Sequence, residues 1–350
     1  MDISEERPDS HLPDPIADTE KIEENSGRRA RLSVSPLRNS LARLWRDWRT
    51  RACVGVLGFF VLLSLAGPPI YQHIGGLYTS PLDGHVYGPN VYHTYYHEEL
   101  TRQDELPSSQ YWLGTDEIGR DMLARLMQGL LVSIGLAVAV AIVDFLLGVS
   151  IGVLAGYYGG FLDQFLARFT DLNLAFPTLL FLIMLAGIYG EGADAFFDKY
   201  IPWLGGAGGG RIAIIFASLA LFVWPGTARL ARGQTIQLKT EQFVDAARAS
   251  GTTSLGVIMR HIVPNLLSVV IVSVTLDMAG TIEGEAGISL LGLGIQPPGS
   301  SLGLMIASAT PNITVYPYEI LLPSAVLTIL VLAFSFLGDA IQDAFSPQQV

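Results

Sequence analysis

The chain has 350 residues, of which 50% are hydrophobic and only 15% are charged. A soluble domain of ordinary composition carries about 25% charged residues. This composition disfavours a soluble protein and predicts a protein that lies in the membrane.

Six apolar runs are each about as long as the roughly 20 residues needed to cross the hydrocarbon core. None alternates as a β-barrel strand does, and backbone groups cannot stay unpaired in lipid, so each run predicts a helix. The predicted spans are residues 52–70, 130–156, 172–190, 212–231, 266–281 and 320–337. We therefore expect an all-α membrane protein with six transmembrane helices.

The charges around the first span predict its orientation. Residues 28–51 hold eight Arg against one acid, Asp47, whereas residues 71–117 hold seven acids against Arg102 alone. Basic flanks favour the cytoplasmic side, and the five Lys or Arg within residues 229–261 agree with that orientation. We expect both termini to be cytoplasmic.

The residues before the first span divide into two predicted segments. Residues 1–27 are polar and acidic and hold too few apolar side chains for a core, which predicts a disordered cytoplasmic tail. Residues 28–51 place Leu and Trp at helical spacing among Arg, which predicts a basic amphipathic helix in the membrane interface. An ordinary juxtamembrane segment is the alternative. Residues 52–346 form the predicted transmembrane domain.

The loop after the first span is rich in Tyr, Pro and His. His93 and His97 are spaced as metal ligands on one helical face would be. Because Pro89 precedes them and nothing predicts a helix, we interpret the loop as solvated and expect no metal site. Shortly afterwards, Thr115 is the predicted cap of a helix whose first turn holds Asp116 and Glu117.

The segment EQFVDAARASGTTSLGVIMRHIVPN, residues 241–265, predicts two short helices on the cytoplasmic side. The first ends before Gly251, and the second is capped within residues 252–254 and runs to about Arg260. Pro264 marks the start of the fifth span. A plain surface hairpin is the simplest interpretation of this pattern.

This segment resembles the EAA loop of ABC-importer permeases, the motif that docks in a cleft of the ATPase subunit. Asp245 stands where Glu is usual in that motif. Small side chains permit close helix approach, glycine permits the turn, and arginines can pair with acids of a partner. The expected docking residues are Glu241, Asp245, Ala246, Ala247, Arg248, Gly251, Arg260 and Pro264.

Five further segments resemble C-type permeases of dipeptide, oligopeptide and nickel importers. They occupy residues 111–129, 155–177, 224–234, 285–305 and 337–345, so the likeness covers about residues 52–346. The first segment, YWLGTDEIGRDMLARLMQG, contains an outer motif that we expect to pack the outer mouth of the pore. Its residues are Gly114, Thr115, Asp116, Gly119, Arg120 and Asp121.

The resemblance implies the type I importer (MetI-like) permease fold, with a core at residues 115–343 and a coupling loop at residues 241–264. It implies a prokaryotic cytoplasmic-membrane subunit that works with a homologous B-type permease, two ATP-binding subunits and an extracytoplasmic solute-binding protein. ATP and Mg would bind the partner subunits, so we expect no cofactor and no catalytic residue in this chain. We also expect contact with membrane lipid and no nucleic-acid partner.

The lysines support this division of labour, because none of the three ends a GxxxxGK[ST] phosphate-binding loop. The expected cargo is a dipeptide or oligopeptide, with nickel or another small solute as the alternative. An ion-coupled secondary transporter is a further alternative, although the halves show no internal repeat.

Four acids fall at membrane depth, where an ionised side chain costs at least about 2.5 kcal/mol on insertion scales. Such groups should face a partner, a cavity or the pore. We expect Asp144 and Asp277 to pair with neighbouring helices. The candidate pore or gate residues are Asp277, Glu283 and Glu285.

Overall fold

The computed structural model describes residues 44–201 and 208–345. This part of the chain contains six helices that are long and apolar enough to cross a membrane. They are α3 (Trp48–Tyr71), α5 (Met122–Tyr158), α7 (Thr178–Tyr200), α9 (Gly209–Leu238), the continuous helix Ser254–Leu290 and α14 (Pro317–Phe345). The predicted tail and residues 28–43 of the predicted amphipathic helix lie outside the described residues.

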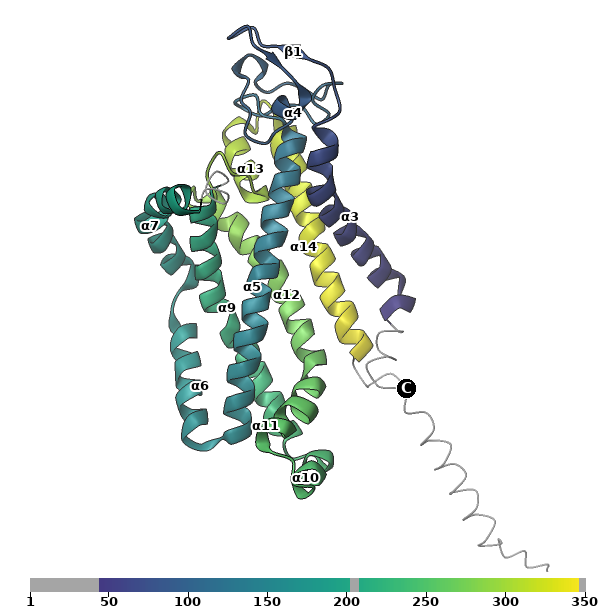
Figure 1. The fold of residues 1–350 in the computed structure, drawn as a ribbon, viewed down its shortest axis with the longest axis vertical. Coiled ribbons are helices and arrows are strands. Elements are labelled where there is room, and N and C mark those ends of the chain that lie inside the picture. Colours follow the sequence, from purple (N-terminus) through teal and green to yellow (C-terminus); the bar gives the residue numbers. More distant parts are fainter. Residues whose placement is uncertain (1–43, 202–207, 346–350) are drawn as a thin grey trace, which may run out of the picture.

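The long helices form a bundle with a different structure at each end (Figure 1). One end carries residues 72–121, which we call the cap; it contains the hairpin β1 (Tyr78–Thr79) and β2 (Val86–Tyr87), α4 (Pro89–Tyr92) and η1 (Leu100–Arg102). The opposite end, which we call the turn end, carries α10 (Gln242–Ala249). Near the cap end, α13 (Leu302–Ala309) and η3 (Thr310–Asn312) precede α14.

The apolar core is divided along the length of the bundle. Near the cap end, side chains of α3, α5, α13 and α14 pack around Leu130, Ile282 and Leu330. Near the turn end, α5, α9 and α10 pack around Leu266. Large apolar side chains such as Leu146 and Leu180 also point outward, as expected when the solvent is lipid.

Helices α5 and α9 approach closely along three glycines of α5 spaced four residues apart. A Cβ at Gly148 would lie 2.7 Å from Thr227 Cβ, and one at Gly152 would lie 2.4 Å from the Ala228 carbonyl oxygen. At Gly156, the nearest atom would be the Arg232 carbonyl oxygen, at 2.8 Å. Because these three positions of α5 carry no side chain, the backbones of α5 and α9 can lie this close together.

The expected third span at residues 172–190 is wrong in its boundaries. The structure instead has α6 (Gly160–Ala175), a break at Phe176 and Pro177, and then α7. Pro177 lacks an amide hydrogen and disfavours helical backbone at the residue before it, and Phe176 is accordingly extended. In Figure 1, α6 leads from the turn end and α7 continues towards the cap end.

The expected second short helix of the coupling segment is also wrong in its length. α11 (Ser254–Val257) continues through the π-helical segment η2 (Ile258–Ile262) into α12 (Val263–Leu290). Pro264 lies directly after η2 inside this continuous helix, where its missing amide hydrogen removes one helical backbone bond. One helix thus reaches from the exposed turn to the far end of the membrane span.

Replacing Gly152 by Ala should destabilise the protein by about 1–3 kcal/mol, because the new methyl would overlap backbone atoms of α9. The measurement is the Tm of the purified protein. Gly135→Ala is the matched control, since a Cβ there meets no atom within 4 Å and Ala favours the helix. If Gly152→Ala and Gly135→Ala lower the Tm equally, the close contact between α5 and α9 does not determine the stability.

Candidate functional site

The coupling segment forms an exposed helix and a tight turn at the turn end of the bundle. α10 ends at Ala249, and Gly251 follows with φ +82°, a conformation that favours glycine. The Thr252 amide donates to the Ala247 carbonyl oxygen at 3.1 Å, which closes the turn. Thr253 caps α11 by accepting the Gly256 amide hydrogen at 3.3 Å.

One face of α10 is held by the body of the protein. Val244 is fully buried, and Ala247 packs beside it against the cluster that contains Val153 and Ala231. The Arg248 guanidinium lies 5.3 Å from the centre of the Tyr157 ring, so it also contacts α5. The turn is therefore joined to both α5 and α9.

The opposite face of α10 is free to meet another molecule. Glu241, Asp245 and Ala246 are exposed there, and Asp245 lies 3.7 Å from Arg248. Arg260 is exposed beyond the turn, at the edge of a depression of about 540 Å³ that includes Gly251.

Three exposed apolar residues of this surface were missed in the sequence analysis. Phe243 is 40% exposed, Leu255 67% and Met259 59%. The signal was available, because Leu255 and Met259 are four residues apart in a segment expected to lie outside the membrane. Apolar groups surrounded by charges are typical of a protein interface.

Asp144 and Asp277 lie on two helices that pack against each other, α5 and α12. Asp144 is fully buried on α5 and accepts the Thr227 hydroxyl of α9 at 3.1 Å. On α12, the Ser273 hydroxyl lies 3.5 Å from Asp277 Oδ2. Neither acid has a basic partner among residues 44–201 and 208–345.

The other two candidate gate residues lie in contrasting surroundings on α12. Glu285 is fully buried and accepts hydroxyl hydrogens from Ser133, Ser289 and Ser301 at 3.2, 2.8 and 2.7 Å. Glu283 is exposed on the outside of the chain at membrane depth. Of these two residues, Glu283 is accessible at the surface and Glu285 is not.

The outer motif is a buried polar network between the cap and α5. The Asp116 carboxylate accepts the Arg120 amide and guanidinium hydrogens, each at 2.8 Å, and also pairs with Arg125. Gly114 and Gly119 have positive φ, and a Cβ at Gly119 would lie 1.9 Å from the Glu99 carbonyl oxygen. The network fixes the cap on the bundle.

The predicted cap at Thr115 is wrong, because α5 begins only at Met122 and is capped by Asp121. Asp121 Oδ1 accepts the Leu123 and Ala124 amide hydrogens at 2.8 and 3.1 Å. The positive φ at Gly119 turns the chain before a helix can start. Thr115 instead accepts the Glu105 amide hydrogen at 2.9 Å.

The cap also differs from the solvated loop expected at residues 71–111. His93 is 2% exposed, and its Nδ1 lies 2.6 Å from Asp121 Oδ2. The rings of Tyr92 and Tyr111 pack around it. Burial lowers the pKa of nearby His97. Within the described residues, no group of three or more His, Cys, Asp or Glu side chains could hold a metal ion.

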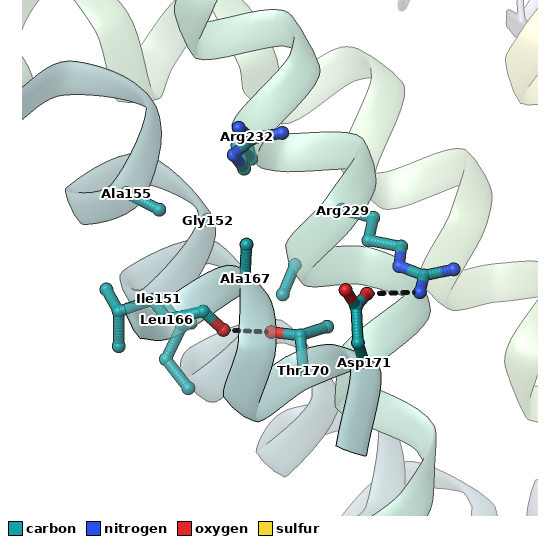
Figure 2. Close-up of a pocket in the computed structure, with 10 residues that line it drawn as sticks. Ile151, Gly152, Ala155, Leu166, Ala167, Thr170, Asp171, Arg229 and Arg232 are labelled. Carbon is teal, nitrogen blue, oxygen red and sulfur yellow. Dashed lines mark hydrogen bonds and ion pairs between the residues drawn. The ribbon is translucent and has the colours of Figure 1, made fainter. Parts of the chain in front are cut away.

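A cavity of about 290 Å³ separates α6 from α5 and α9. Figure 2 shows two arginines of α9 beside it, with Arg229 paired to Asp171 of α6 at 2.6 Å. Arg232 donates to both carboxylate oxygens of Asp163, at 2.5 and 2.8 Å. Around this cavity, charged pairs across the gap connect α6 to α9.

Comparison with known proteins places the chain in a family. The family described as binding-protein-dependent transport system inner membrane component matches residues 148–349, which is more than half of the chain. The chain belongs to this family.

Relatives and solved structures resemble the chain as well. A Brucella suis biovar 1 protein named as a peptide permease is 34% identical over 252 residues, covering 71% of this chain and 77% of the relative. The glutathione transport system permease protein GsiD of Escherichia coli is 30% identical over 330 residues, covering 93% and 98%. The inward-facing MetNI methionine ABC transporter matches with a TM-score of 0.49 and 18% identity, covering 64% of this chain and 98% of that one.

Family membership confirms the expected class. The chain is a multi-pass permease subunit of an ABC importer in the cytoplasmic membrane, with six membrane-spanning helices. It is a transport component rather than an enzyme, and such components work with ATP-binding subunits and a binding protein.

The ion pair between Asp163 and Arg232 should stabilise the protein in a pH-dependent way. The Arg232 hydrogen bonds lower the pKa of Asp163. The ion pair therefore stabilises the folded protein above the pKa of an Asp in an unfolded chain, about 3.9. This stabilisation is lost as the pH falls through the pKa of Asp163 in the folded protein. Asp163→Asn should lower the stability by at most about 1 kcal/mol at pH 7, because both groups are partly exposed.

The measurement is the Tm of wild type and variant between pH 3 and 7. The difference should shrink at the acid end, where wild type loses the pair. Asp198→Asn, at an exposed Asp of α7, controls for loss of charge. A Tm difference that is constant with pH would contradict this role for the ion pair.

Proposed function

We propose that this permease subunit translocates dipeptides or oligopeptides and is driven by a separate ATPase that docks on the turn of α10 and α11. The observation that carries the proposal is the continuous helix Ser254–Leu290, which begins at the exposed turn and ends beyond Glu283 and Glu285. Because α10 is also packed on α5 and α9, a push on the turn displaces several spans together.

The exposed residues of the turn suit a protein partner. Phe243, Leu255 and Met259 supply an apolar centre, and Asp245 and Arg260 supply charges at its edge. Interfaces commonly have an apolar centre within a polar rim. The side chain of Ala246 is a single methyl group, so a partner can approach the α10 backbone closely.

The charge distribution supports an orientation in which the turn end and both termini are cytoplasmic and the cap is outside. In this arrangement, two ATP-binding subunits lie below the bundle and a solute-binding protein lies above the cap. A homologous B-type permease completes the path. ATP and Mg bind the ATPase subunits, and this chain needs no cofactor of its own.

Glu283 is the residue that we place on the translocation path. Its carboxylate is exposed at membrane depth and can accept hydrogen bonds from the ammonium group of a peptide. Relatives named as a peptide permease and a glutathione permease support a peptide-like cargo. Nickel or another small solute remains the second candidate, because an exposed carboxylate also attracts cations.

The direct test is uptake into proteoliposomes that contain this subunit, its permease partner and the ATPases. We expect ATP-dependent, binding-protein-dependent uptake of labelled dipeptides, compared in parallel with glutathione and nickel. Uptake by this chain without an ATPase would contradict the coupling mechanism. Uptake of nickel alone would contradict the peptide assignment.

A substitution at Gly251 should weaken docking of the ATPase and leave insertion of this chain into the membrane unchanged. A β-branched residue at φ +82° costs about 1–3 kcal/mol, so Gly251→Val should lower substrate-stimulated ATP hydrolysis roughly tenfold. Gly251→Asn is the matched control, because Asn tolerates positive φ and a Cβ there meets no atom within 4 Å. If the two variants behave alike in the reconstituted assembly, the turn geometry does not determine coupling.

Glu283→Gln should remove a preference for peptides with a free amino terminus. A hydrogen bond to a charged group contributes about 1.5–3 kcal/mol, which corresponds to about 10–100-fold in uptake. The measurement compares a dipeptide with its N-acetylated form. Glu191→Gln, at an exposed acid of α7, should keep the wild-type preference. If Glu283→Gln still prefers the dipeptide to its N-acetylated form, Glu283 does not contact the solute on the translocation path.

A further inference from the structure

Four buried side chains from three helices meet near the cap end of the bundle. The carboxylate of Glu285 on α12 accepts hydroxyl hydrogens from three serines. They are Ser133 of α5, Ser289 of α12 and Ser301, the N-cap of α13. Glu285 and Ser301 are fully buried, and the other two serines are 1% exposed. We call these four residues the joint, because one carboxylate connects α5, α12 and the start of α13.

The joint determines how α13 begins. Ser301 donates its hydroxyl hydrogen to Glu285 Oε1 at 2.7 Å and accepts the Leu304 amide hydrogen at 3.0 Å. A side-chain oxygen at this position satisfies an amide that has no partner within the helix. Because a hydroxyl group carries only one hydrogen, its donation to Glu285 leaves the oxygen lone pairs free to accept from the helix. Glu285 therefore orients the N-cap of α13.

Close backbone contacts lie on both sides of the first turn of α13. A Cβ at Gly129 of α5 would lie 3.1 Å from the Leu302 nitrogen. A Cβ at Gly303 would lie 2.6 Å from the Cα of Ala286 on α12. Glycine at these two positions lets α13 pack directly against both helices, and such close packing leaves little room for sliding.

The start of α13 is also connected to the cap. Ser300 donates its hydroxyl hydrogen to the Arg125 carbonyl oxygen at 3.0 Å. The guanidinium group of Arg125 pairs with Asp116 of the outer motif. The cap, the first turn of α5 and the start of α13 therefore belong to one polar network.

Two helices lead from the joint to the coupling turn at the opposite end. Val153 of α5 and Leu266 of α12 belong to the turn-end core that holds α10 through Val244. Ser133 and Glu285 lie further along the same two helices. In Figure 1, α5 and α12 run side by side from the turn end towards α13.

We propose that Glu285 is a positioning residue that holds α5, α12 and α13 together as one rigid body during the transport cycle. This inference rests on the proposed docking of an ATPase at the turn, and it means that displacement of the turn carries α13 and the cap along. Opening the joint would leave a carboxylate and three hydroxyl groups without partners in low-dielectric surroundings, which is unfavourable. Movement during transport therefore occurs around the joint and not within it.

The joint needs hydrogen bonding from residue 285 and not its charge. Among the described residues, no ion pair includes Glu285. In Glu285→Gln, the side-chain oxygen can accept from Ser289 and Ser301, and the amide group can donate to the Ser133 oxygen. Glu285→Gln therefore keeps the joint, whereas Glu285→Met keeps the approximate size and removes the hydrogen bonds.

The test measures distances between pairs of spin labels in the assembled transporter in proteoliposomes, with and without trapped nucleotide. The label sites are Leu131→Cys on α5, Leu290→Cys on α12 and Thr310→Cys directly after α13, all at exposed positions. Cys53→Ala removes the only cysteine of the chain, and the partner subunits stay unlabelled. With Glu285 or with Glu285→Gln, we expect each distance to be the same in both nucleotide states.

The second measurement is solute uptake per ATP hydrolysed. Glu285→Met should lower this ratio about tenfold and broaden the distance between Thr310 and Leu131, because buried hydroxyl groups lose their acceptor. Ser301→Ala removes one connection and should cause a smaller change in the same direction. Glu285→Gln should keep the wild-type ratio. ATP hydrolysis itself should continue in all three variants, since the docking turn is unchanged.

A nucleotide-dependent change in either distance to Thr310 in wild type would overturn the proposal, because α13 would then move as a separate gate. This result decides the matter even if Glu285→Met fails to assemble. Equal loss of uptake in Glu285→Gln and Glu285→Met would also overturn it, since the charge itself would then be required. ATP-independent uptake by wild type would instead contradict docking of an ATPase at the turn, so the two proposals fail by different results.

Discussion

The packing of α10 on the turn-end core is the contact on which the rest of the mechanism depends. Val244 is fully buried there, and the helix that follows the turn runs without interruption to Leu290. A displacement of the turn acts directly on this helix, whose backbone hydrogen-bond ladder is irregular at η2 and Pro264. The exposed turn and the acids at membrane depth therefore belong to one mechanical unit.

The polar groups inside the bundle are organised by the low dielectric around them. Glu285 is satisfied by three hydroxyl groups, whereas Asp144 has one oxygen without a donor in the described structure. In the cap, the Asp116 carboxylate pairs with two arginines at once. Unpaired polar groups are costly in such surroundings, so each of these contacts restricts how the helices can move.

The helices are held together with unequal strength. α5 and α9 touch along Gly148, Gly152 and Gly156. α6 contacts α9 through the stacked rings of Phe169 and Trp224 and through ion pairs, with a cavity beside these contacts. The break at Pro177 also frees α6 from α7. A bundle with one closely packed helix pair and one helix contact that contains a cavity suits a protein whose spans must change position during transport.

The composition and the apolar runs of the sequence determined that this is a helical membrane protein and where its apolar spans lie, and Gly251 with its neighbours determined the exposed turn. Hydrophobicity over 20 residues and a glycine stop signal are local properties, so no tertiary information was needed. The helix boundaries were less accurate, because Pro177 interrupted an apolar run and η2 joined two segments into one helix.

Tertiary structure alone decided how the candidate residues are used. It turned Ala247 inward and left Ala246 exposed, buried Glu285 beside serines of three segments, and moved the helix cap from Thr115 to Asp121. It also brought the Tyr318 hydroxyl of α14 to the Glu105 carbonyl oxygen of the cap, more than two hundred residues away. The identity of a residue specifies its charge and size, but its neighbours across the bundle decide whether that charge is paired, shared or presented to a partner.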